Sequence, residues 1–455
     1  MKTSSWIKAL RSELGAAVLS TRASDLQEHG GDAWFAHALP DAVVTPRNSS
    51  QVQTLLRFCF KHRIPVTPRG AGRGYVGGCV PVRGGVSLSL RRMNRIVEIS
   101  AADGVAVVEP GVITGDLQTA VKKLGLFYPP DPASAGESSI GGNIATNAGG
   151  PRCLKYGVTR NYVLGLEVVL AHGDLVRLGG RTHKNKLGFN LTDLFTGSEG
   201  MLGLVTQATL RLIPHPPARS IVVASFAKAP HAAAAVRAIQ KAGILPSVLE
   251  VADKFTLQAA RRLNPDTPDG EALILVEIDG QSASVRSETR QLAALLKSCR
   301  ALSVQFAGDG PRAEKLWDIR RGFSYSLKAT GLTKLNEDVV VPRGKLVALF
   351  NFAGTLQKKY GLQVACFGHA GDGNIHVNLM VEPARAHSRE NRRALDDLFA
   401  QVLKWKGSIT GEHGVGLAKK PWWRDATSPE LRRLHQAVKS ALDPKHLLNP
   451  GKFLD

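Results

Sequence analysis

The spacing of apolar and polar residues predicts that helices and short strands alternate in the first part of the chain. Residues 4–14 place apolar side chains on one side of a helix. Residues 49–60 begin with two serines that can cap a helix, and the residues after them repeat this spacing. Alternating runs at 86–90, 95–99 and 104–108, separated by turn-prone residues, predict strands. This part of the chain is therefore expected to combine helices with a sheet.

A proline-rich segment, residues 214–217, predicts the main domain boundary. Before it, residues 163–178 have the pattern of a β-hairpin that turns at His172-Gly173-Asp174. After it, the pattern predicts an α+β domain with helices on one face of a sheet. Its clearest expected strands and helices are 221–225, 232–242, 272–278 and 283–298.

Residues 68–78 read PRGAGRGYVGG, and five of these eleven residues are glycine. Glycines let the backbone approach a ligand closely and turn successive N–H groups toward an anion, so we expect a diphosphate-binding loop. The loop contains Gly72-x-Gly74-x-x-Gly77, but proline and a Gly-Gly pair follow it where a dinucleotide-binding fold needs a helix. That fold is excluded, and a flexible surface loop is the alternative.

Two further glycine-rich stretches, residues 139–150 and 197–203, follow along the chain. Small residues can serve tight backbone packing alone, which is the structural alternative. Two glycine-rich loops between residues 68 and 150 favour one large flat ligand held at two places. Its phosphates would lie in the first loop and its ring near the second.

The composition is that of an ordinary globular protein, with 43% hydrophobic and 21% charged residues, but the formal net charge is +21. This excess suits nucleic acid, an anionic membrane or anionic substrates. Basic residues are spread along the chain without a nucleic-acid-binding motif, so no nucleic acid is expected. Five dispersed cysteines without a CxxC pair indicate a reducing, cytoplasmic compartment and no iron–sulfur ligand set. A mitochondrial presequence is the alternative for the N-terminus, but its acidic residues oppose it.

Histidines and a carboxylate form the strongest chemical signal. Residues 361–380 predict a hairpin with His369 and His376 on adjacent strands beside the turn, and Glu412 and His413 follow in a glycine-rich segment. Two histidines and one glutamate are typical ligands for Zn²⁺, Fe²⁺ or Mn²⁺ with open positions for substrate. Alternatively, His369 caps the hairpin turn, His376 is a histidine of the core and Glu412 is a solvated carboxylate. Arg320, on a helical pattern, could clamp a carboxylate, although a lone helix arginine usually lies on the surface.

Several motifs together resemble those of the FAD-dependent D-2-hydroxy-acid dehydrogenases of the vanillyl-alcohol oxidase superfamily. The resemblance runs from about Leu10 to Lys452. This family includes D-lactate dehydrogenases, the flavoprotein subunit of glycolate oxidase and D-2-hydroxyglutarate dehydrogenase. The motifs are RGAG, PDPAS, GGNIATNAGG, KYG, GSEGMLG, GHAGDGNIHVN and GEHGVG.

The resemblance implies an α+β fold in which a two-subdomain FAD-binding domain carries an α+β cap. The implied limits are residues 1–215 for an N-terminal helix and the FAD domain, and 216–407 for the cap with substrate and metal. Residues 408–455 would complete the active site and pack back on the FAD domain.

The resemblance also implies roles for individual residues. His369, His376 and Glu412 would bind the metal. His413 adjoins Glu412 and titrates near neutrality, so we expect it to act as the general base, and Arg320 is also expected among the catalytic residues. Substrate contacts would come from Arg320, Ser324, Asn378 and His413. FAD would be held by Arg69, Gly70, Ala71, Gly72, Arg73, Gly74, Gly77, Pro130, Ser134, Gly141, Gly142, Asn143, Thr146, Gly149, Glu199, Gly203 and Val205.

The implied activity is oxidation of a D-2-hydroxy acid to its 2-oxo acid, with non-covalent FAD and a divalent metal, zinc first and iron or manganese as alternatives. The electron acceptor would be a quinone, a cytochrome or an electron-transfer protein. We expect the protein to be cytoplasmic and to form a homodimer or a complex with partner subunits. Peripheral contact with the inner membrane is also expected. Alternatives are a flavoprotein subunit of a multi-subunit glycolate oxidase and a non-redox relative of the same fold.

Three positions depart from the family pattern. Arg73 and Val76 stand where threonine and serine are common. Asn336 stands where some dicarboxylate-oxidising members have lysine, and Lys334 is nearby in another register.

Overall fold

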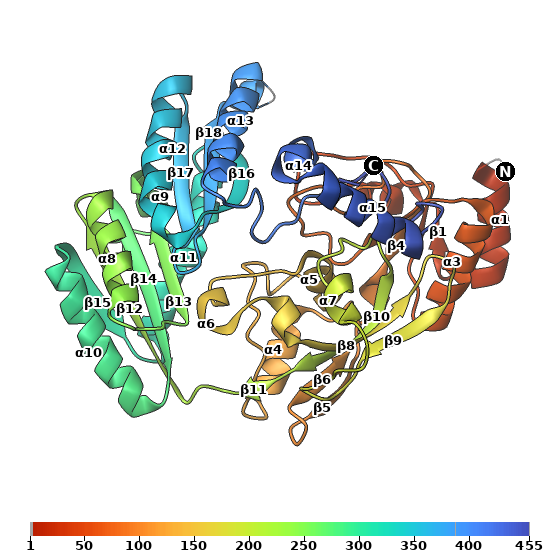
Figure 1. The fold of residues 1–455 in the computed structure, drawn as a ribbon, viewed down its shortest axis with the longest axis horizontal. Helices are drawn as coiled ribbons and strands as arrows, with labels where there is room; N and C mark the ends of the chain where they lie inside the picture. The colour runs from red at the N-terminus through yellow and green to blue at the C-terminus, as the bar shows by residue number, and fades with distance from the viewer. Residues whose placement is uncertain (1–2, 387, 455) are drawn as a thin grey trace. The chain divides into compact units, whose positions relative to one another are not determined.

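The computed structural model describes residues 3–386 and 388–454, and the chain forms two compact units (Figure 1). Unit 1 contains the chain up to Gly149, Val158–His215 and the chain from Glu412 onward. Unit 2 contains Gly150–Gly157 and Pro216–Gly411. The passage from unit 1 to unit 2 after His215 lies in the proline-rich segment. Within the described residues, no helix has the length and apolar character that crossing a membrane requires.

Unit 1 begins with a four-stranded sheet, ordered β1-β2-β4-β3, against which two helices pack. The first helix buries Trp6, Leu10 and Leu14, as its apolar spacing predicts. The second is capped by Asn48, whose side chain accepts from the Gln51 amide at 3.0 Å, and not by the serines that follow it. The elements are α1 (Thr3–Leu14), β1 (Leu19–Ser20), α2 (Ala23–Glu28), β2 (Ala42–Val44), α3 (Ser49–His62), β3 (Val66–Arg69), β4 (Val86–Ser89) and η1 (Leu90–Arg92).

A five-stranded antiparallel sheet, ordered β5-β6-β10-β8-β9, forms the rest of the unit 1 framework. Its strands are β5 (Ile96–Ser100), β6 (Val105–Val108), β8 (Val163–Val169), β9 (Leu175–Gly179) and β10 (Leu204–Arg211). The predicted hairpin is confirmed as β8 and β9. Other elements are α4 (Thr114–Lys122), β7 (Leu126–Phe127), α5 (Ile140–Thr146), η2 (Thr159–Tyr162), α7 (Leu191–Phe195), β11 (Ile213–Pro214), α14 (Lys420–Ala426) and α15 (Pro429–Leu442).

The second glycine-rich stretch, expected as a loop, contains the short helix α5. Ser139 precedes it, and its hydroxyl accepts from the Gly142 amide at 3.3 Å, which caps the first turn. This N-cap offsets the entropic cost of two glycines in the helix.

Unit 2 is built on a seven-stranded antiparallel sheet, ordered β15-β12-β14-β13-β17-β18-β16. The strands are β12 (Ala218–Phe226), β13 (Val248–Ala252), β14 (Ala272–Gly280), β15 (Ala301–Ala307), β16 (Thr333–Val340), β17 (Gln363–His369) and β18 (Asn374–Val381). The helices are α6 (Cys153–Tyr156), α8 (Ala229–Lys241), α9 (Lys254–Leu263), α10 (Ser282–Ser298), α11 (Pro311–Lys328), η3 (Arg343–Lys345), α12 (Leu346–Tyr360), η4 (Pro383–Arg385) and α13 (Arg389–Lys404).

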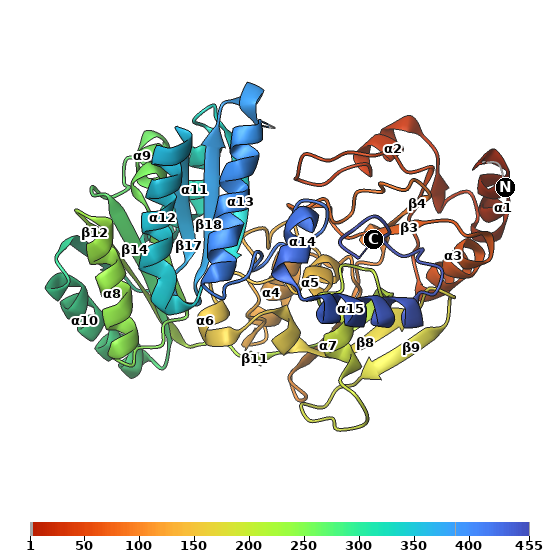
Figure 2. The ribbon, with the colours of Figure 1, turned by 45° about the horizontal axis from the view of Figure 1, so that its top comes forward.

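Helices cover both faces of this sheet, so the expectation of one covered face was wrong. Helices α8, α10, α12 and α13 pack in one layer, and α9 and α11 pack together on the opposite face (Figure 2). Strand β18 is buried at every position, and β14 at all but its last. Strands without an exposed face need cover on both sides.

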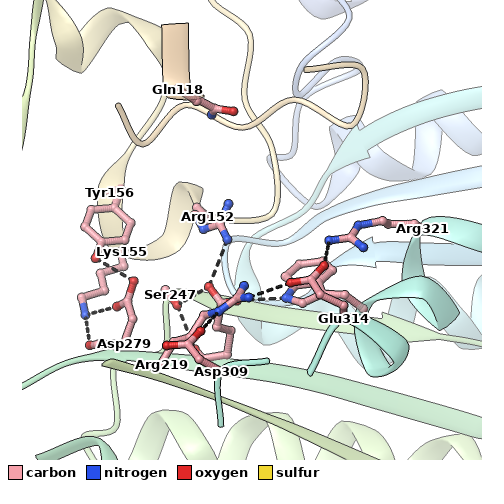
Figure 3. A network of polar contacts seen from close by, with 12 residues as sticks. Gln118, Arg152, Lys155, Tyr156, Arg219, Ser247, Asp279, Asp309, Glu314 and Arg321 are labelled. Carbon is pink, nitrogen blue, oxygen red and sulfur yellow. Dashed lines mark hydrogen bonds and ion pairs between the residues drawn. The ribbon is translucent and has the colours of Figure 1, made fainter. Parts of the chain in front are cut away.

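Residues 150–157 belong to unit 2 although the sequence placed them in the FAD domain. Lys155 Nζ lies 2.5 Å from Asp279 Oδ1, and the Tyr156 hydroxyl donates to Asp279 Oδ2 at 2.8 Å (Figure 3). Arg152 donates to Glu277 at 3.2 Å, and the same carboxylate accepts from Trp317 Nε1 at 2.9 Å. These buried carboxylates on β14 fix the segment to the sheet.

Candidate functional site

The first two glycine-rich stretches lie against each other in unit 1. The Ala71 amide donates to the Ser139 hydroxyl at 3.2 Å. A Cβ at Gly70 would come within 2.6 Å of that hydroxyl, so only glycine fits there. The loop therefore meets the first turn of α5, so the two stretches that the sequence predicted to hold one ligand are neighbours in unit 1.

The expected cofactor residues spread over four parts of unit 1. Arg69 through Gly77 form the end of β3 and the glycine loop, and Pro130 and Ser134 lie in the proline-rich segment after β7. On or just after α5 lie Gly141, Gly142, Asn143, Thr146 and Gly149. The glycine-rich turn before β10 supplies Glu199 and Gly203, and Val205 is on β10 itself.

Several of these side chains are engaged within the protein. Arg69 donates to the Gly31 carbonyl at 2.5 Å and Arg73 Nε pairs with Glu137 at 2.8 Å. Buried Asn143 donates to Thr114 at 2.7 Å. Through these contacts the three side chains hold the backbone of the glycine loop and its neighbouring segments in place.

Glu199 connects to the C-terminal part of unit 1. Its carboxylate accepts from the amides of Val415 and Gly416 at 2.8 and 2.9 Å. Burial raises the pKa of Glu199, while these two amides oppose the rise. Glu199 thus holds the GEHGVG segment in place through these two hydrogen bonds.

In unit 2 a chain of polar side chains crosses the sheet face that α9 and α11 cover. Arg320 of α11 is only 9% exposed, and its Nε donates to Glu250 of β13. The other Glu250 oxygen lies 2.5 Å from His369 Nδ1, and the rings of His369 and His376 are 5.5 Å apart. The guanidinium lies 5.0 Å from the Phe367 ring centre. Arg320 is thus a buried residue of the site and not a surface residue.

Glu250 keeps its charge in this interior. Burial alone would raise its pKa, but the charges and hydrogen bonds of Arg320 and His369 lower the pKa to about 2. A carboxylate on Nδ1 orients the imidazole and leaves its Nε2 directed elsewhere, as in many metal sites.

Two asparagines face each other across β16 and β18 on the same sheet face. Asn336 and Asn378 are register partners. Asn378 donates to the carbonyls of Ala365 and His376 at 3.0 Å each. Among the described residues, neither Asn336 Oδ1 nor Asn378 Oδ1 has a hydrogen-bond partner, although both are buried. Such acceptors suit a ligand that carries a hydroxyl group.

Lys334 lies two residues before Asn336, so both side chains are on the same face of β16. Its ammonium group donates to the Ser324 hydroxyl of α11 at 2.8 Å. Burial, with a smaller effect of Lys328, lowers the pKa of Lys334 to about 8. Lys334 stands in another register than Asn336, as the sequence indicated, but it shares the face of that residue and contacts Ser324, an expected substrate residue.

The segment that leads to Glu412 is anchored on this face of the unit 2 sheet. The Gly411 amide donates to Asp338 Oδ2 at 2.9 Å, and Asp338 is the register partner of His376. Glu412 follows Gly411 directly, so its backbone starts one residue after the Gly411–Asp338 hydrogen bond. Of the three expected metal ligands, His369 and His376 lie on neighbouring strands of unit 2, and Glu412 is the first residue of the C-terminal part of unit 1. His413, the next residue, stacks on Tyr75 in unit 1 with ring centres 5.3 Å apart.

Glu250 and Asp338 were not predicted from the sequence. Glu250 had a signal, because it is an acidic residue inside the apolar run 248–252. A carboxylate there must be paired once the strand is buried on both sides. Its partners lie 70 and 119 residues away, and only the fold brings them together.

Comparison with protein families matches two family models to the chain. Residues 40–179 match the FAD binding domain, and residues 215–453 match the FAD linked oxidases, C-terminal domain. Glycolate oxidase subunit GlcD of Bacillus subtilis is 40% identical over 420 residues, covering 91% of this chain and 89% of that one. D-lactate dehydrogenase of Archaeoglobus fulgidus is 35% identical, covering 90% and 91%. D-lactate dehydrogenase of Anaerostipes hadrus is 32% identical, covering 93% and 92%.

Solved structures agree on the fold. p-Cresol methylhydroxylase with bound substrate superimposes with a TM-score of 0.81 at 21% identity, covering 99% of this chain and 96% of that one. An alkyldihydroxyacetonephosphate synthase gives a TM-score of 0.77 at 20% identity, covering 99% and 85%. The expected α+β fold of the vanillyl-alcohol oxidase type is confirmed.

Proposed function

The chain belongs to the FAD-linked oxidases, and on this premise we propose that it oxidises a D-2-hydroxy acid to the corresponding 2-oxo acid. Relatives that match most of the chain are named D-lactate dehydrogenase or glycolate oxidase subunit. The observation that carries the proposal is the polar chain on the buried face of unit 2. Its charges and orphan amide oxygens fit a small hydroxylated anion.

Arg320 is the residue proposed to bind the substrate carboxylate. Glu250 accepts from its Nε, which leaves the two terminal amino groups of the fork for a bidentate contact. The Phe367 ring lies beside the guanidinium and limits its motion. Asn378 and Ser324 are proposed to contact the same substrate, with Lys334 as an additional cation.

His413 is proposed to take the proton from the substrate hydroxyl. When bound, FAD would accept the hydride from C2 of the hydroxy acid. The substrate would therefore give its hydroxyl proton to His413 and its hydride to FAD. Stacking on Tyr75 fixes the plane of the imidazole. An oriented base of this kind is what general-base catalysis requires.

We propose that FAD binds non-covalently to the glycine loop and the first turn of α5. The backbone N–H groups there suit a diphosphate, and Gly72 and Gly77 adopt φ of +71° and +70°, which other residues rarely adopt. Arg73 can leave its exposed pair with Glu137 to meet a phosphate, since such surface pairs are weak.

The residues also fit a divalent metal, which we propose to be zinc, with iron or manganese as alternatives. His369, His376 and Glu412 would hold it, and Glu250 would orient His369. When bound, the metal would make the substrate hydroxyl more acidic.

The metal assignment predicts loss of metal from His376→Ala and Glu412→Gln with FAD retained, because three ligands from separate segments leave an incomplete site when one is removed. Metal analysis and flavin absorbance on the same samples measure this. His172→Ala, in an exposed turn of unit 1, is the matched control and should keep full metal. Full metal in both ligand variants would refute the assignment.

The function is tested with a panel of D- and L-2-hydroxy acids and an artificial dye as electron acceptor. The purified protein should be yellow and should release free FAD when it is denatured. Its flavin absorbance should bleach when D-2-hydroxy acids are added. A dicarboxylate in the panel tests whether Lys334 receives a second carboxylate, and Lys334→Met should then lose that substrate selectively. Bleaching by L-acids alone, or by none, would contradict the proposal.

The cellular electron acceptor is proposed to be a quinone, a cytochrome or an electron-transfer protein, with the enzyme in the cytoplasm. The name of the Bacillus subtilis relative favours a second candidate, a flavoprotein subunit that works only with partner subunits. Size measurement of the protein purified from its natural host distinguishes the two. An active homodimer supports the first, and a larger mixed complex supports the second.

A further inference from the structure

The loop between β9 and α7 in unit 1 exposes two large apolar side chains almost completely. Leu187 is 91% exposed and Phe189 is 92% exposed. Leu191 and Leu194 of the adjoining helix α7 are 39% and 38% exposed. Single exposed apolar residues are common, but neighbouring ones at such exposure indicate an interaction surface. We name residues 180–190 the apolar–basic loop.

The apolar–basic loop is also positively charged. Lys184 and Lys186 flank the apolar tip, and no acidic residue occurs between Asp174 and Asp193. Within the described part of the chain, neither lysine forms an ion pair or a side-chain hydrogen bond, so both charges are available. The protein as a whole carries a formal charge of +21. A partner must therefore offer apolar volume together with negative charge.

Ion pairs fix the base of the loop. Arg181 donates to both oxygens of Glu98 at 2.7 and 2.8 Å and to Asp103 at 2.6 Å. These acidic residues lie on β5 and in the turn that follows it, so the loop is tied to the far edge of the same sheet.

Hydrogen bonds within the loop define its tip. Asn185 accepts from the Leu187 amide at 2.9 Å, and the Phe189 carbonyl accepts from the Leu191 amide at 2.9 Å. Because the backbone is held on both sides, presenting the two apolar side chains costs little further ordering on binding.

We propose that the apolar–basic loop docks the protein on an anionic lipid bilayer. Leu187 and Phe189 enter the boundary between headgroups and acyl chains, while Lys184 and Lys186 contact anionic headgroups. The unpaired lysines beside the apolar tip favour a lipid surface over an apolar protein groove. The docking uses no residue assigned to catalysis, so it is tested without turnover and stands or fails separately from the proposed oxidation.

Sedimentation of the full-length, FAD-loaded protein with vesicles tests the docking. The protein should partition onto phosphatidylglycerol–phosphatidylcholine vesicles, much less onto phosphatidylcholine alone, and added salt should weaken the partition. Leu187→Ser/Phe189→Ser should reduce the partition by at least about tenfold. Lys184→Gln/Lys186→Gln should reduce it by about fivefold for each lysine.

Matched controls come from unit 2. Leu302→Ser removes an apolar side chain that is 58% exposed, and Lys345→Gln/Lys358→Gln removes two exposed charges. Both should bind vesicles as the wild type does. In a second measurement, Phe189→Trp should be quenched by brominated lipids and Leu302→Trp should not.

Three results would overturn the proposal. The wild type could fail to bind anionic vesicles, or the loop variants could bind as tightly as the wild type. The loop variants could also change only the oligomeric state in size-exclusion chromatography, which would assign the loop to a protein contact.

Discussion

His413→Asn should slow the reduction of bound FAD by about 10²–10⁴-fold, the range typical for loss of a general base. Asparagine keeps a polar group of similar size next to Glu412 but cannot accept the substrate proton. The residue lies on the segment that Glu199 holds through two backbone amides, so the backbone should remain in place. FAD and metal contents should therefore stay at wild-type levels.

Anaerobic stopped-flow measurement of flavin bleaching at saturating substrate gives this rate directly. Tyr75→Phe is the matched control, since it keeps an aromatic ring beneath the imidazole and should reduce FAD at close to the wild-type rate. Bleaching of the His413→Asn protein at the wild-type rate would move the base to another residue.

Glu250→Gln should destabilise unit 2 by about 3–5 kcal/mol, the cost of removing one partner from a buried ion pair. Arg320 would lose its charge partner in the interior, and His369 would lose the carboxylate that orients it. Calorimetry of the full-length protein should show a lower transition temperature for unit 2. Glu382→Gln, at an exposed position of the same unit, should change stability by less than about 0.5 kcal/mol.

The effect should depend on pH in a defined direction. The pKa of Glu250 is about 2 in the folded protein and 4.5 ordinarily, so its stabilisation is fully present above about pH 4.5. It is lost as the pH falls toward 2, because the folded state must then take up the proton. The stability difference between wild type and Glu250→Gln should thus shrink from pH 5 to pH 2. A constant difference over that range would show that the charge of Glu250 is not what stabilises unit 2.

The local pattern predicted most elements because their apolar spacing is strong. Helix α1 and the β8–β9 hairpin are examples. The motif spacing also predicted that His369 and His376 lie on adjacent strands, since seven residues around a turn leave few arrangements. The covering of both faces of the unit 2 sheet was missed because it depends on how helices far apart in the sequence pack.

The environment of Arg320 was hidden for the same physical reason. Helical periodicity shows that a residue lies on a helix, but the depth of burial depends on the strand opposite. Only the structure reveals that Glu250 and Phe367 surround the guanidinium. Likewise, glycine content indicated a ligand loop, whereas the capping hydroxyl of Ser139 that turned the second stretch into a helix is a single local contact.

The anchoring of residues 150–157 on β14 limits how this protein can be recombined with its relatives. A chimera that exchanged only residues 216–411 would leave Asp279 and Glu277 without Lys155, Tyr156 and Arg152. A graft of unit 2 therefore needs two separate pieces of gene, and the shorter encodes eight residues. Evolution of new substrate ranges in this architecture should show these two pieces changing together.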